Sequence, residues 1–288
     1  MSTADAVDRY AVLGHPVAHS QSPFIHAAFA RQTGQALEYG RLLCPLDGFA
    51  AALRRFADEG GRGCNVTVPF KHEAFALAHV HTARAARAGA CNALRLDAGR
   101  WLGDNTDGAG LLRDIERNAG VALAGRRVLL IGAGGAAAGV LGPLLDARPA
   151  RLVIANRSPE KARALARSHA AGSAPTGQPT TDLEATGLAD CGTGFDVVIN
   201  ATASSMLAAG VPVAETTLGP GALAIDLMYG APARFFLEWA RKHGAIARDG
   251  LGMLVEQAAE AFELFRGVAP QTAPVLAELR RRIDEAGA

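Results

Sequence analysis

Short apolar runs rich in β-branched residues alternate along the chain with longer segments of helical periodicity. In the first part, the pattern predicts strands at residues 9–14, 38–43, 63–68 and 90–96, a hairpin partner near Trp101, and helices at 23–32, 48–59, 72–78 and 82–88. Strands that alternate with helices are typical of an α/β fold with largely parallel sheets, because each parallel pair needs a crossover connection.

A second series of elements follows the first. The pattern predicts strands at 128–132, 151–156, 196–200 and 222–226, and helices at 233–243, 251–265 and 272–286. Segment 171–194 is rich in Gly, Ala, Pro and Thr and predicts a surface connection with at most a short helix. We therefore expect two domains, one formed by 1–107 and completed by helices from 248–288, and the other by 108–247.

Composition narrows the function classes. A chain of 288 residues with 49% hydrophobic and 20% charged residues can bury a substantial core. Its formal net charge of +1 gives no general attraction to nucleic acid or to an anionic membrane. The N-terminus lacks the features of a secretory signal, and no apolar run is long enough to span a membrane, so we expect a cytoplasmic protein.

Metal binding is not expected either. The four cysteines form no Cys-x-x-Cys pair. His15 and His19 are four residues apart, but Pro16 breaks the helix that would align them on zinc.

The run NVTVPFK, residues 65–71, places an amine at the end of a strand. Val66, Thr67 and Val68 favour an extended backbone. Pro69 cannot donate to a ladder and ends the strand, so Lys71 falls in the first turn of the next helix. Lys71 is therefore a candidate for proton transfer, and the alternative is an ordinary solvated lysine at a helix start.

Residues 126–145, RRVLLIGAGGAAAGVLGPLL, predict a strand, a glycine turn and an alanine-rich helix. Gly132, Gly134 and Ala137 occupy the positions of the G-x-G-x-x-G/A dinucleotide fingerprint. The glycines permit a tight turn and close approach of a pyrophosphate, which would lie at the helix N-terminus. The strand before and the helix after make this pattern indicate a nucleotide site.

The end of the next strand indicates which nucleotide. Asn156 stands where an NAD enzyme usually carries an acid for the ribose hydroxyls. Arg157, Ser158 and Lys161 supply positive charge and a hydroxyl suited to a 2′-phosphate. The pattern favours NADP over NAD, although the same residues could cap and solvate a helix start at Pro159.

Three further polar clusters have no evident structural reason. Ser20 and Ser22 precede a helix and suit a small carboxylate, with an N-cap role for Ser22 as the alternative. Asn92 lies near the start of an otherwise apolar strand. Asp107 lies in the first turn of the helix that joins the domains, and Asp104 is an equally good cap candidate.

Gln257 lies within the helix predicted at 251–265, on or near its packed face. A buried glutamine needs hydrogen-bond partners, and an interior amide bonded to backbone is as plausible as a substrate contact. Its apolar neighbours on that face are Met253, Leu254, Ala258, Ala261 and Phe262.

Taken in order, these segments resemble the shikimate dehydrogenase family along nearly the whole chain. The matching segments are HPVAHSQSPFIH, NVTVPFK, AGACNAL, GDNTDG, GAGGAA, NRSPEKA, INATASS, DLMYG and DGLGMLVEQAAEAF. The resemblance implies a substrate-binding domain and a Rossmann-like NADP-binding domain with a cleft between them. It also implies reversible NADP-linked reduction of 3-dehydroshikimate to shikimate, in the biosynthesis of chorismate and aromatic amino acids.

The resemblance also assigns residues by motif. It implies a catalytic pair of Lys71 and Asp107, and a carboxylate site of Ser20 and Ser22. The rest of the substrate pocket would be Thr67, Asn92, Tyr229 and Gln257. NADP would be held by Gly132, Ala133, Gly134, Gly135, Ala136, Asn156, Arg157, Ser158, Lys161, Leu227 and Gly250.

Two departures from the family pattern concern the cofactor. Ala138 stands where relatives often carry an arginine, and INATASSM lacks the glycine that many place after the serine pair. The alternatives are a quinate or dual quinate/shikimate dehydrogenase that uses NAD or NADP, and a catalytically silent relative that binds NADP or a metabolite. We expect a small-molecule substrate, no nucleic-acid or membrane partner, no metal, and a monomer or homodimer.

Overall fold

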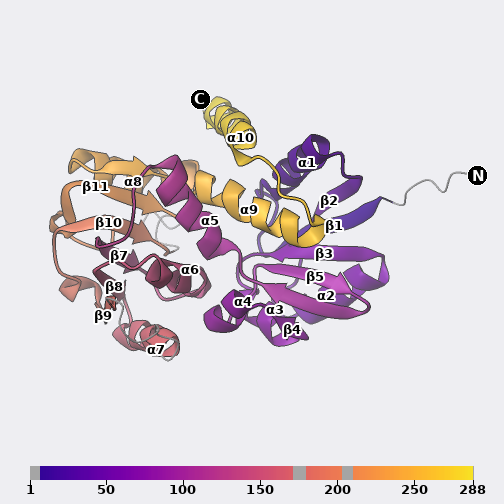
Figure 1. Cartoon of the computed structure of the whole chain (residues 1–288), viewed down its shortest axis with the longest axis horizontal. Coiled ribbons are helices and arrows are strands. Elements are labelled where there is room, and N and C mark those ends of the chain that lie inside the picture. Colours follow the sequence, from indigo (N-terminus) through magenta and orange to yellow (C-terminus); the bar gives the residue numbers. More distant parts are fainter. Residues whose placement is uncertain (1–6, 171–179, 203–209, 288) are drawn as a thin grey trace, which may run out of the picture. The chain divides into compact units, whose positions relative to one another are not determined.

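The computed structural model describes residues 7–170, 180–202 and 210–287 (Figure 1). The chain forms two compact units, one of Met1–Gly110 with Val255–Leu279 and the other of Leu111–Leu254 with Arg280–Ala288. Both contain strands and helices, which confirms the α/β prediction. Across the described ranges, no helix combines the length and apolar character needed to cross a bilayer.

The first unit is built on a six-stranded sheet of order β2-β1-β3-β5-β6-β4. β1 pairs with β2 and β3 in parallel, and β4 pairs with β6 in parallel, whereas β5 is antiparallel to both β3 and β6. The sheet is therefore mixed. Its strands are β1 (Asp8–Gly14), β2 (Leu37–Leu43), β3 (Gly61–Val66), β4 (Val80–His81), β5 (Ala93–Asp97) and β6 (Arg100–Asp104).

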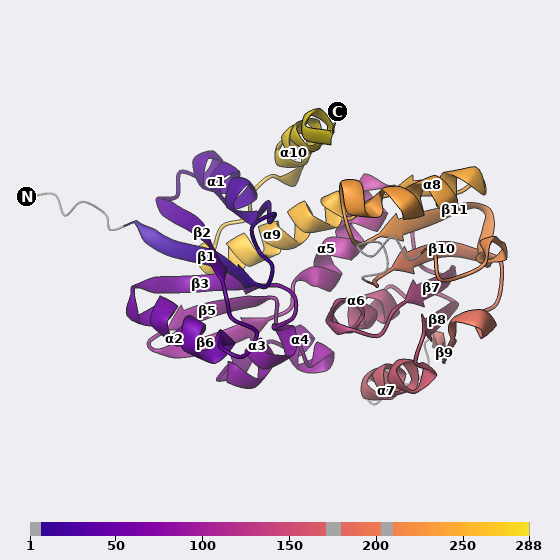
Figure 2. The same ribbon diagram turned by 180° about the vertical axis from the view of Figure 1, so that it is seen from behind.

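Helices cover both faces of this sheet, which can be followed in the rear view of Figure 2. On one face Phe49 stacks on Phe70, with ring centroids 4.9 Å apart. On the other face Phe29 and Phe262 meet edge to face at 5.7 Å. The helices of this unit are α1 (Ser22–Thr33), α2 (Phe49–Asp58), α3 (Lys71–Leu77), α4 (Ala83–Ala88), the first turn of α5 (Asp107–Arg113), most of α9 (Leu251–Arg266) and the first half of α10 (Thr272–Gly287).

Strand β3 ends two residues earlier than the predicted limit of 68. The Thr67 amide still donates to the Leu13 carbonyl, but the Thr67 carbonyl accepts from the Phe70 amide and closes a turn. Val68 consequently lies outside the sheet and is exposed. The turn brings Lys71 to the start of α3, as the sequence predicts.

The second unit has a parallel sheet of order β12-β11-β10-β7-β8-β9. Counted from β7, this is the 3-2-1-4-5-6 order of the Rossmann fold, which places a switch point between β7 and β10. Its strands are β7 (Arg127–Ile131), β8 (Arg151–Asn156), β9 (Asp182–Gly187), β10 (Phe195–Asn200), β11 (Leu218–Asp226) and β12 (Ile246–Arg248).

Strand β9 shows that the prediction for segment 171–194 is wrong in part. Residues 171–179 lie outside the described ranges, but Asp182–Gly187 form an edge strand that pairs with β8 along its whole length. The sequence DLEATG did not predict a strand because it has no continuous apolar run. A strand at the edge of a sheet is half exposed and does not need one.

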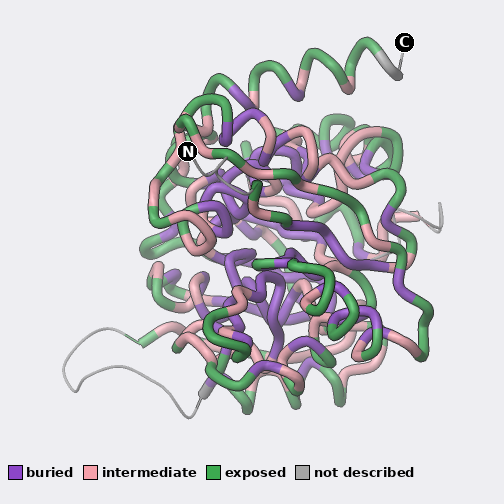
Figure 3. The backbone as a smooth tube through the Cα atoms, turned by 90° about the vertical axis from the view of Figure 1, so that its right-hand side faces the viewer, coloured by how far each residue is buried: buried purple, intermediate pink, exposed green. Residues whose placement is uncertain are grey.

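Helices enclose the second sheet on both faces. α6 contributes Val140, Leu141 and Leu144 to one core, and α8 contributes Phe236 and Ala240 to the other. The central strands β7, β8 and β10 of this sheet are largely buried. Figure 3 colours the backbone trace by burial, from buried purple to exposed green. The helices are the end of α5, a π-helical turn (Asp114–Asn118), α6 (Gly135–Asp146), α7 (Pro159–Ala170), α8 (Arg234–Lys242) and the start of α9, and α10 (Thr272–Gly287) extends into this unit.

Candidate active site

Lys71 and Asp107 form an ion pair in the first unit. Lys71 is the first residue of α3 and Asp107 the first residue of α5, and Lys71 Nζ donates to Asp107 Oδ2 at 2.5 Å. The side chains are 15% and 7% exposed, respectively. Two helix starts thus bring together an amine and a carboxylate that are largely withdrawn from water.

Asn92 holds the other oxygen of the same carboxylate. Its Nδ2 donates to Asp107 Oδ1 at 2.9 Å, to Thr106 Oγ1 at 2.8 Å and to Gln257 Oε1 at 3.1 Å, so two amide hydrogens are shared among three acceptors. Asn92 Oδ1 accepts from the Thr106 amide at 2.8 Å. The network fixes the orientation of the Asp107 carboxylate against Lys71.

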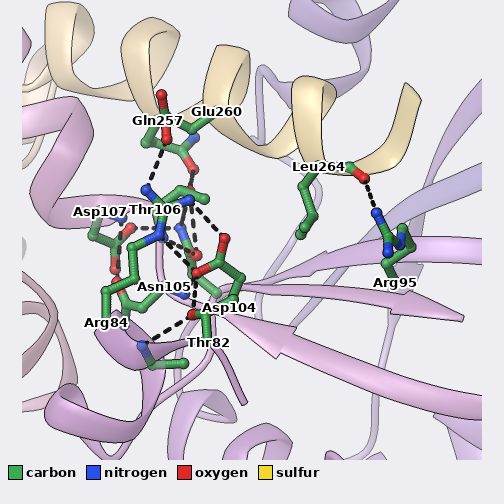
Figure 4. A network of polar contacts seen from close by, with 12 residues as sticks. Thr82, Arg84, Arg95, Asp104, Asn105, Thr106, Asp107, Gln257, Glu260 and Leu264 are labelled. Carbon is green, nitrogen blue, oxygen red and sulfur yellow. Dashed lines mark hydrogen bonds and ion pairs between the residues drawn. The ribbon is translucent and has the colours of Figure 1, made fainter. Parts of the chain in front are cut away.

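Four of the residues singled out in the sequence therefore share one network, which Figure 4 shows in part. Thr106 belongs to it as well, because its hydroxyl lies 3.3 Å from Gln257 Oε1. Thr106 was not predicted from the sequence, although it directly precedes Asp107 in GDNTDG. Thr106 lies between Asp104 and Asp107, and a threonine in such a segment indicates a functional site less clearly than the carboxylates do.

Gly110 permits the approach of α9 to this network. A Cβ at Gly110 would lie 2.6 Å from both the backbone nitrogen and Cβ of Gln257. Only a residue without a side chain allows α5 and α9 to come this close. The glycine thereby allows the Gln257 amide to come within hydrogen-bond distance of Asn92.

The interpretation of Asp104 as a cap for α5 is wrong. Its carboxylate accepts from Arg84, from the Thr82 hydroxyl at 2.6 Å and from the Asn105 amide at 2.7 Å, none of which belongs to α5. Burial acts to raise the pKa of Asp104, but the Arg84 guanidinium outweighs that effect, and the pKa is lowered overall. Asp104 is thus a paired, buried anion beside the site.

Ser20 and Ser22 lie together at the start of α1. Ser20 Oγ donates to Ser22 Oγ at 3.2 Å and accepts from the Ser22 amide at 3.3 Å. Ser22 is the first residue inside the helix and is buried, and Gln21 occupies the cap position without a side-chain bond. The N-cap alternative for Ser22 is therefore wrong.

A buried cluster that the sequence did not reveal continues from Ser22. The Tyr39 hydroxyl donates to Asn65 Oδ1 at 2.6 Å, and Asn65 Nδ2 donates to the Asn92 carbonyl at 3.2 Å. Burial raises the pKa of Tyr39, and hydrogen bonds to Asn65 and Ser22 oppose that rise. Asn65 opens the NVTVPFK motif, and its polarity inside a strand was the available signal.

His26 stacks on Tyr39 with ring centroids 4.1 Å apart. It is 1% exposed, and burial lowers its pKa to about 3. His26 is therefore neutral at any ordinary pH and adds no charge to this side of the site.

The remaining two substrate candidates lie apart in the chain. Thr67 follows β3 in the first unit and is half-buried. Tyr229 follows β11 in the second unit. Their contacts with a substrate stay predictions.

The predicted nucleotide turn joins β7 to α6 in the second unit. Gly132 has a φ of 116°, which side chains rarely adopt, and a Cβ there would lie 3.1 Å from the Ala201 carbonyl oxygen at the end of β10. Gly134 caps α6 without a side-chain bond, and a Cβ there would meet no atom within 4 Å. The turn thus offers open space beside uncapped helix amides, which fits a pyrophosphate. The remaining predicted residues of this turn are Ala133, Gly135 and Ala136.

The second part of the nucleotide site lies at the end of β8. Asn156 Nδ2 donates to the Ser158 carbonyl at 3.0 Å and shapes the turn into α7. Arg157 and Lys161 are exposed there, which leaves their charges accessible to a phosphate.

Leu227 and Gly250 are packed against each other, since a Cβ at Gly250 would lie 2.3 Å from the Leu227 carbonyl oxygen. The INATASSM segment is described only as far as Thr202, so the predicted departure of its loop lies largely outside the described residues. Among the residues the structure describes, no three His, Cys, Asp or Glu side chains gather as a metal site.

Family models match the chain in three stretches. The shikimate dehydrogenase substrate binding domain matches residues 12–94, the shikimate / quinate 5-dehydrogenase model 114–225, and the shikimate 5'-dehydrogenase C-terminal domain 250–280. Among curated proteins, shikimate dehydrogenase (NADP(+)) of Methylibium petroleiphilum is 62% identical, and the match covers 98% of this chain and 97% of that protein.

Solved structures agree with these matches. An Ael1 enzyme from Pseudomonas putida has a TM-score of 0.84 at 47% identity, covering 94% of this chain and 98% of that one. Shikimate 5-dehydrogenase from Thermus thermophilus, solved with NADP(H) and shikimate, has a TM-score of 0.78 at 29% identity, covering 96% and 99% of the two chains.

Proposed function

Because this chain belongs to the shikimate dehydrogenase family, we propose that it catalyses the reversible NADP-linked reduction of 3-dehydroshikimate to shikimate. The observation that carries the proposal is the Lys71–Asp107 ion pair, held by Asn92 in a largely buried network. A family member that only binds a metabolite would need the pocket but not an amine paired in this way.

Oxidation of a secondary alcohol removes a hydride from carbon and a proton from oxygen, so the oxygen needs a proton acceptor. We assign this role to the neutral amine of Lys71, which becomes an ammonium on accepting the proton, and this ammonium donates a proton to the oxygen when the ketone is reduced. Asp107 orients the amine and stabilises its charged form, and Asn92 keeps the carboxylate from rotating. NADP, when bound, supplies the hydride chemistry.

Binding residues complete the proposal. Ser20 and Ser22 would hold the substrate carboxylate, with Thr67, Asn92, Tyr229 and Gln257 as further contacts. The turn from Gly132 to Ala136 would hold the pyrophosphate, and Asn156 to Lys161 the 2′-phosphate. The uncapped N-terminus of α6 and the open space at Gly134 support this assignment.

The test is a steady-state assay of reduced-cofactor formation with each combination of shikimate or quinate and NADP or NAD. We expect the highest kcat/KM with shikimate and NADP. A higher kcat/KM with quinate would identify the chain as a quinate dehydrogenase. The family model that matches residues 114–225 covers both shikimate and quinate 5-dehydrogenases. If neither substrate is turned over but calorimetry shows that the protein binds NADP, the chain is a catalytically silent binding protein. A cytoplasmic location and a monomeric or dimeric state stay predictions.

A further inference from the structure

Arg84 joins three parts of the first unit beside the candidate active site (Figure 4). From α4, its Nε and Nη2 donate to Asp104 Oδ1 and Oδ2 at 2.7 and 2.6 Å. Its remaining nitrogen Nη1 donates to Glu260 Oε2 at 2.7 Å. One guanidinium thus bridges the end of β6 and helix α9.

The Asp104 side of this bridge controls the turn that carries Thr106 and Asp107. Asp104 Oδ1 accepts from the Asn105 amide, and the Asp104 carbonyl accepts from the Asn92 amide at 3.0 Å. Asn105 Oδ1 in turn accepts from the Asp107 amide at 3.2 Å. The buried carboxylate therefore holds the Asn105 backbone, while the Asp104 carbonyl and the Asn105 side chain hold the amides of Asn92 and Asp107.

The Glu260 side controls the helix that carries Gln257. Glu260 lies three residues after Gln257 in α9, so both side chains project from one face of the helix toward the same cluster. Glu260 is 12% exposed and Arg84 is 32% exposed. Because this pair is more shielded from solvent than an ordinary surface ion pair, it ties the two elements together more firmly.

Arg84 and Asp104 both keep their charges near neutral pH, because the pKa of Arg84 is raised and that of Asp104 is lowered. Burial lowers the pKa of Arg84, but hydrogen bonds to Asp104 and Glu260 outweigh it and raise the pKa overall. The fork geometry of arginine satisfies Asp104 with two nitrogens and leaves a third for Glu260. A lysine carries the same charge but cannot hold both carboxylates in this way.

We propose that Arg84 is a positioning residue for the proposed dehydrogenase reaction, on which this inference rests. By bridging Asp104 and Glu260, it fixes the position of the Gln257 amide relative to Asn92 and Asp107. In the described part of the chain, no hydrogen bond or ion pair joins it to Lys71 or Asp107, so it acts on the reaction through Gln257 and the Asn105–Asp107 turn.

The test compares Arg84→Lys with a matched control, Arg95→Lys. Arg95 also tethers α9, through a 2.8 Å bond from Nη1 to the Leu264 carbonyl, but its other partner is the exposed Asp97. We expect Arg84→Lys to lower kcat with shikimate about tenfold and to leave KM for NADP unchanged. Arg95→Lys should keep kcat within about twofold of wild type.

A double-mutant cycle with Gln257→Ala separates positioning from a general structural role. Because Arg84 acts in part through Gln257, the double variant should lose less activity than the product of the two single losses predicts. Losses that multiply, or equal losses in Arg84→Lys and Arg95→Lys, would overturn the proposal. Glu260→Ala, which removes the other end of the same bridge, should reproduce part of the loss in Arg84→Lys.

Hydrogen exchange of the ligand-free protein gives a readout that does not depend on activity. We expect faster exchange at residues 105–107 and 256–260 in Arg84→Lys than in Arg95→Lys. Unchanged exchange there would overturn the inference even if the wild type is active. Conversely, an inactive wild type with the expected exchange pattern would overturn the proposed function and leave the bridge in place.

Discussion

Lys71 and Asp107 pair at 2.5 Å across 36 residues of sequence, and each is the first residue of its helix. The Asp107 carboxylate is held on its other oxygen by Asn92. Because both side chains are largely withdrawn from water and the carboxylate is fixed on its other oxygen, the amine has little freedom to leave it. This relationship supports the proton-transfer role proposed for Lys71 and makes it testable.

Replacement of Lys71 should remove proton transfer. We expect Lys71→Ala to lower kcat by roughly two to four orders of magnitude, the usual size of general acid–base help, while KM for shikimate changes much less. Lys71→Gln is the matched control for folding, since its amide can still donate to Asp107. Both variants should be slow, and a kcat within a few-fold of wild type in either would exclude Lys71 as the base.

The paired serines should govern substrate affinity alone. Ser20→Ala combined with Ser22→Ala removes two hydroxyl donors, each worth about 1.5–3 kcal/mol to a charged group when well aligned. We expect KM for shikimate to rise and KM for NADP to stay the same. An unchanged KM for shikimate would leave the serines with a structural role at the start of α1.

Cofactor choice should depend on Arg157. If Arg157 pairs with the 2′-phosphate, Arg157→Ala should weaken NADP binding by about 2 kcal/mol, roughly thirtyfold, and leave NAD nearly unaffected. The ratio of kcat/KM for the two cofactors measures this, and added salt should reduce the preference in the wild type but hardly in the variant. Equal losses for both cofactors would instead indicate a role in folding or adenine stacking.

His26 should make the protein less stable in mild acid. Its pKa is about 3 in the folded state against an ordinary value of 6.5, so between these values the unfolded chain binds the extra proton. The free energy of unfolding should therefore fall by about 1.4 kcal/mol for each pH unit below about 6.5.

Urea unfolding of His26→Phe between pH 7.5 and 5 checks this, because phenylalanine preserves the stacking on Tyr39 and cannot titrate. We expect a shallower pH dependence in that variant, and the wild-type slope in His243→Gln, whose histidine is exposed. The same slope in wild type and His26→Phe would show that other groups cause the acid sensitivity.

Gly110→Ala should disturb both stability and turnover. The new Cβ would lie 2.6 Å from the Gln257 backbone, and such overpacking costs about 1–3 kcal/mol. We expect a lower melting temperature together with a lower kcat, because α9 must move away from Asn92. Gly40→Ala is the control, since a Cβ there meets no atom within 4 Å. Wild-type kcat in Gly110→Ala would mean that the position of Gln257 tolerates such a shift.

The sequence by itself determined the parts that depend on local chemistry. Alternation of apolar and polar residues predicted most strands and helices, because a buried face imposes a period of 2 or 3.6 on neighbouring residues. The glycine turn at Gly132 follows an equally local rule, whereas β3 ends at Val66, two residues before the limit that Pro69 predicted. Lys71, Asp107, Asn92 and Gln257 could be named because motif order, read as a family resemblance, marks them out.

Tertiary structure alone decided which of these residues meet. No local pattern shows that Gln257 reaches Asn92 across 165 residues, that Gly110 permits it, or that Arg84 pairs with Asp104 rather than facing solvent. Strand β9 and the Tyr39–Asn65 bond were missed for the same reason. Such contacts depend on how elements that are distant in sequence pack together. A short stretch of sequence contains only one side of each contact, so it cannot show which contacts are favourable.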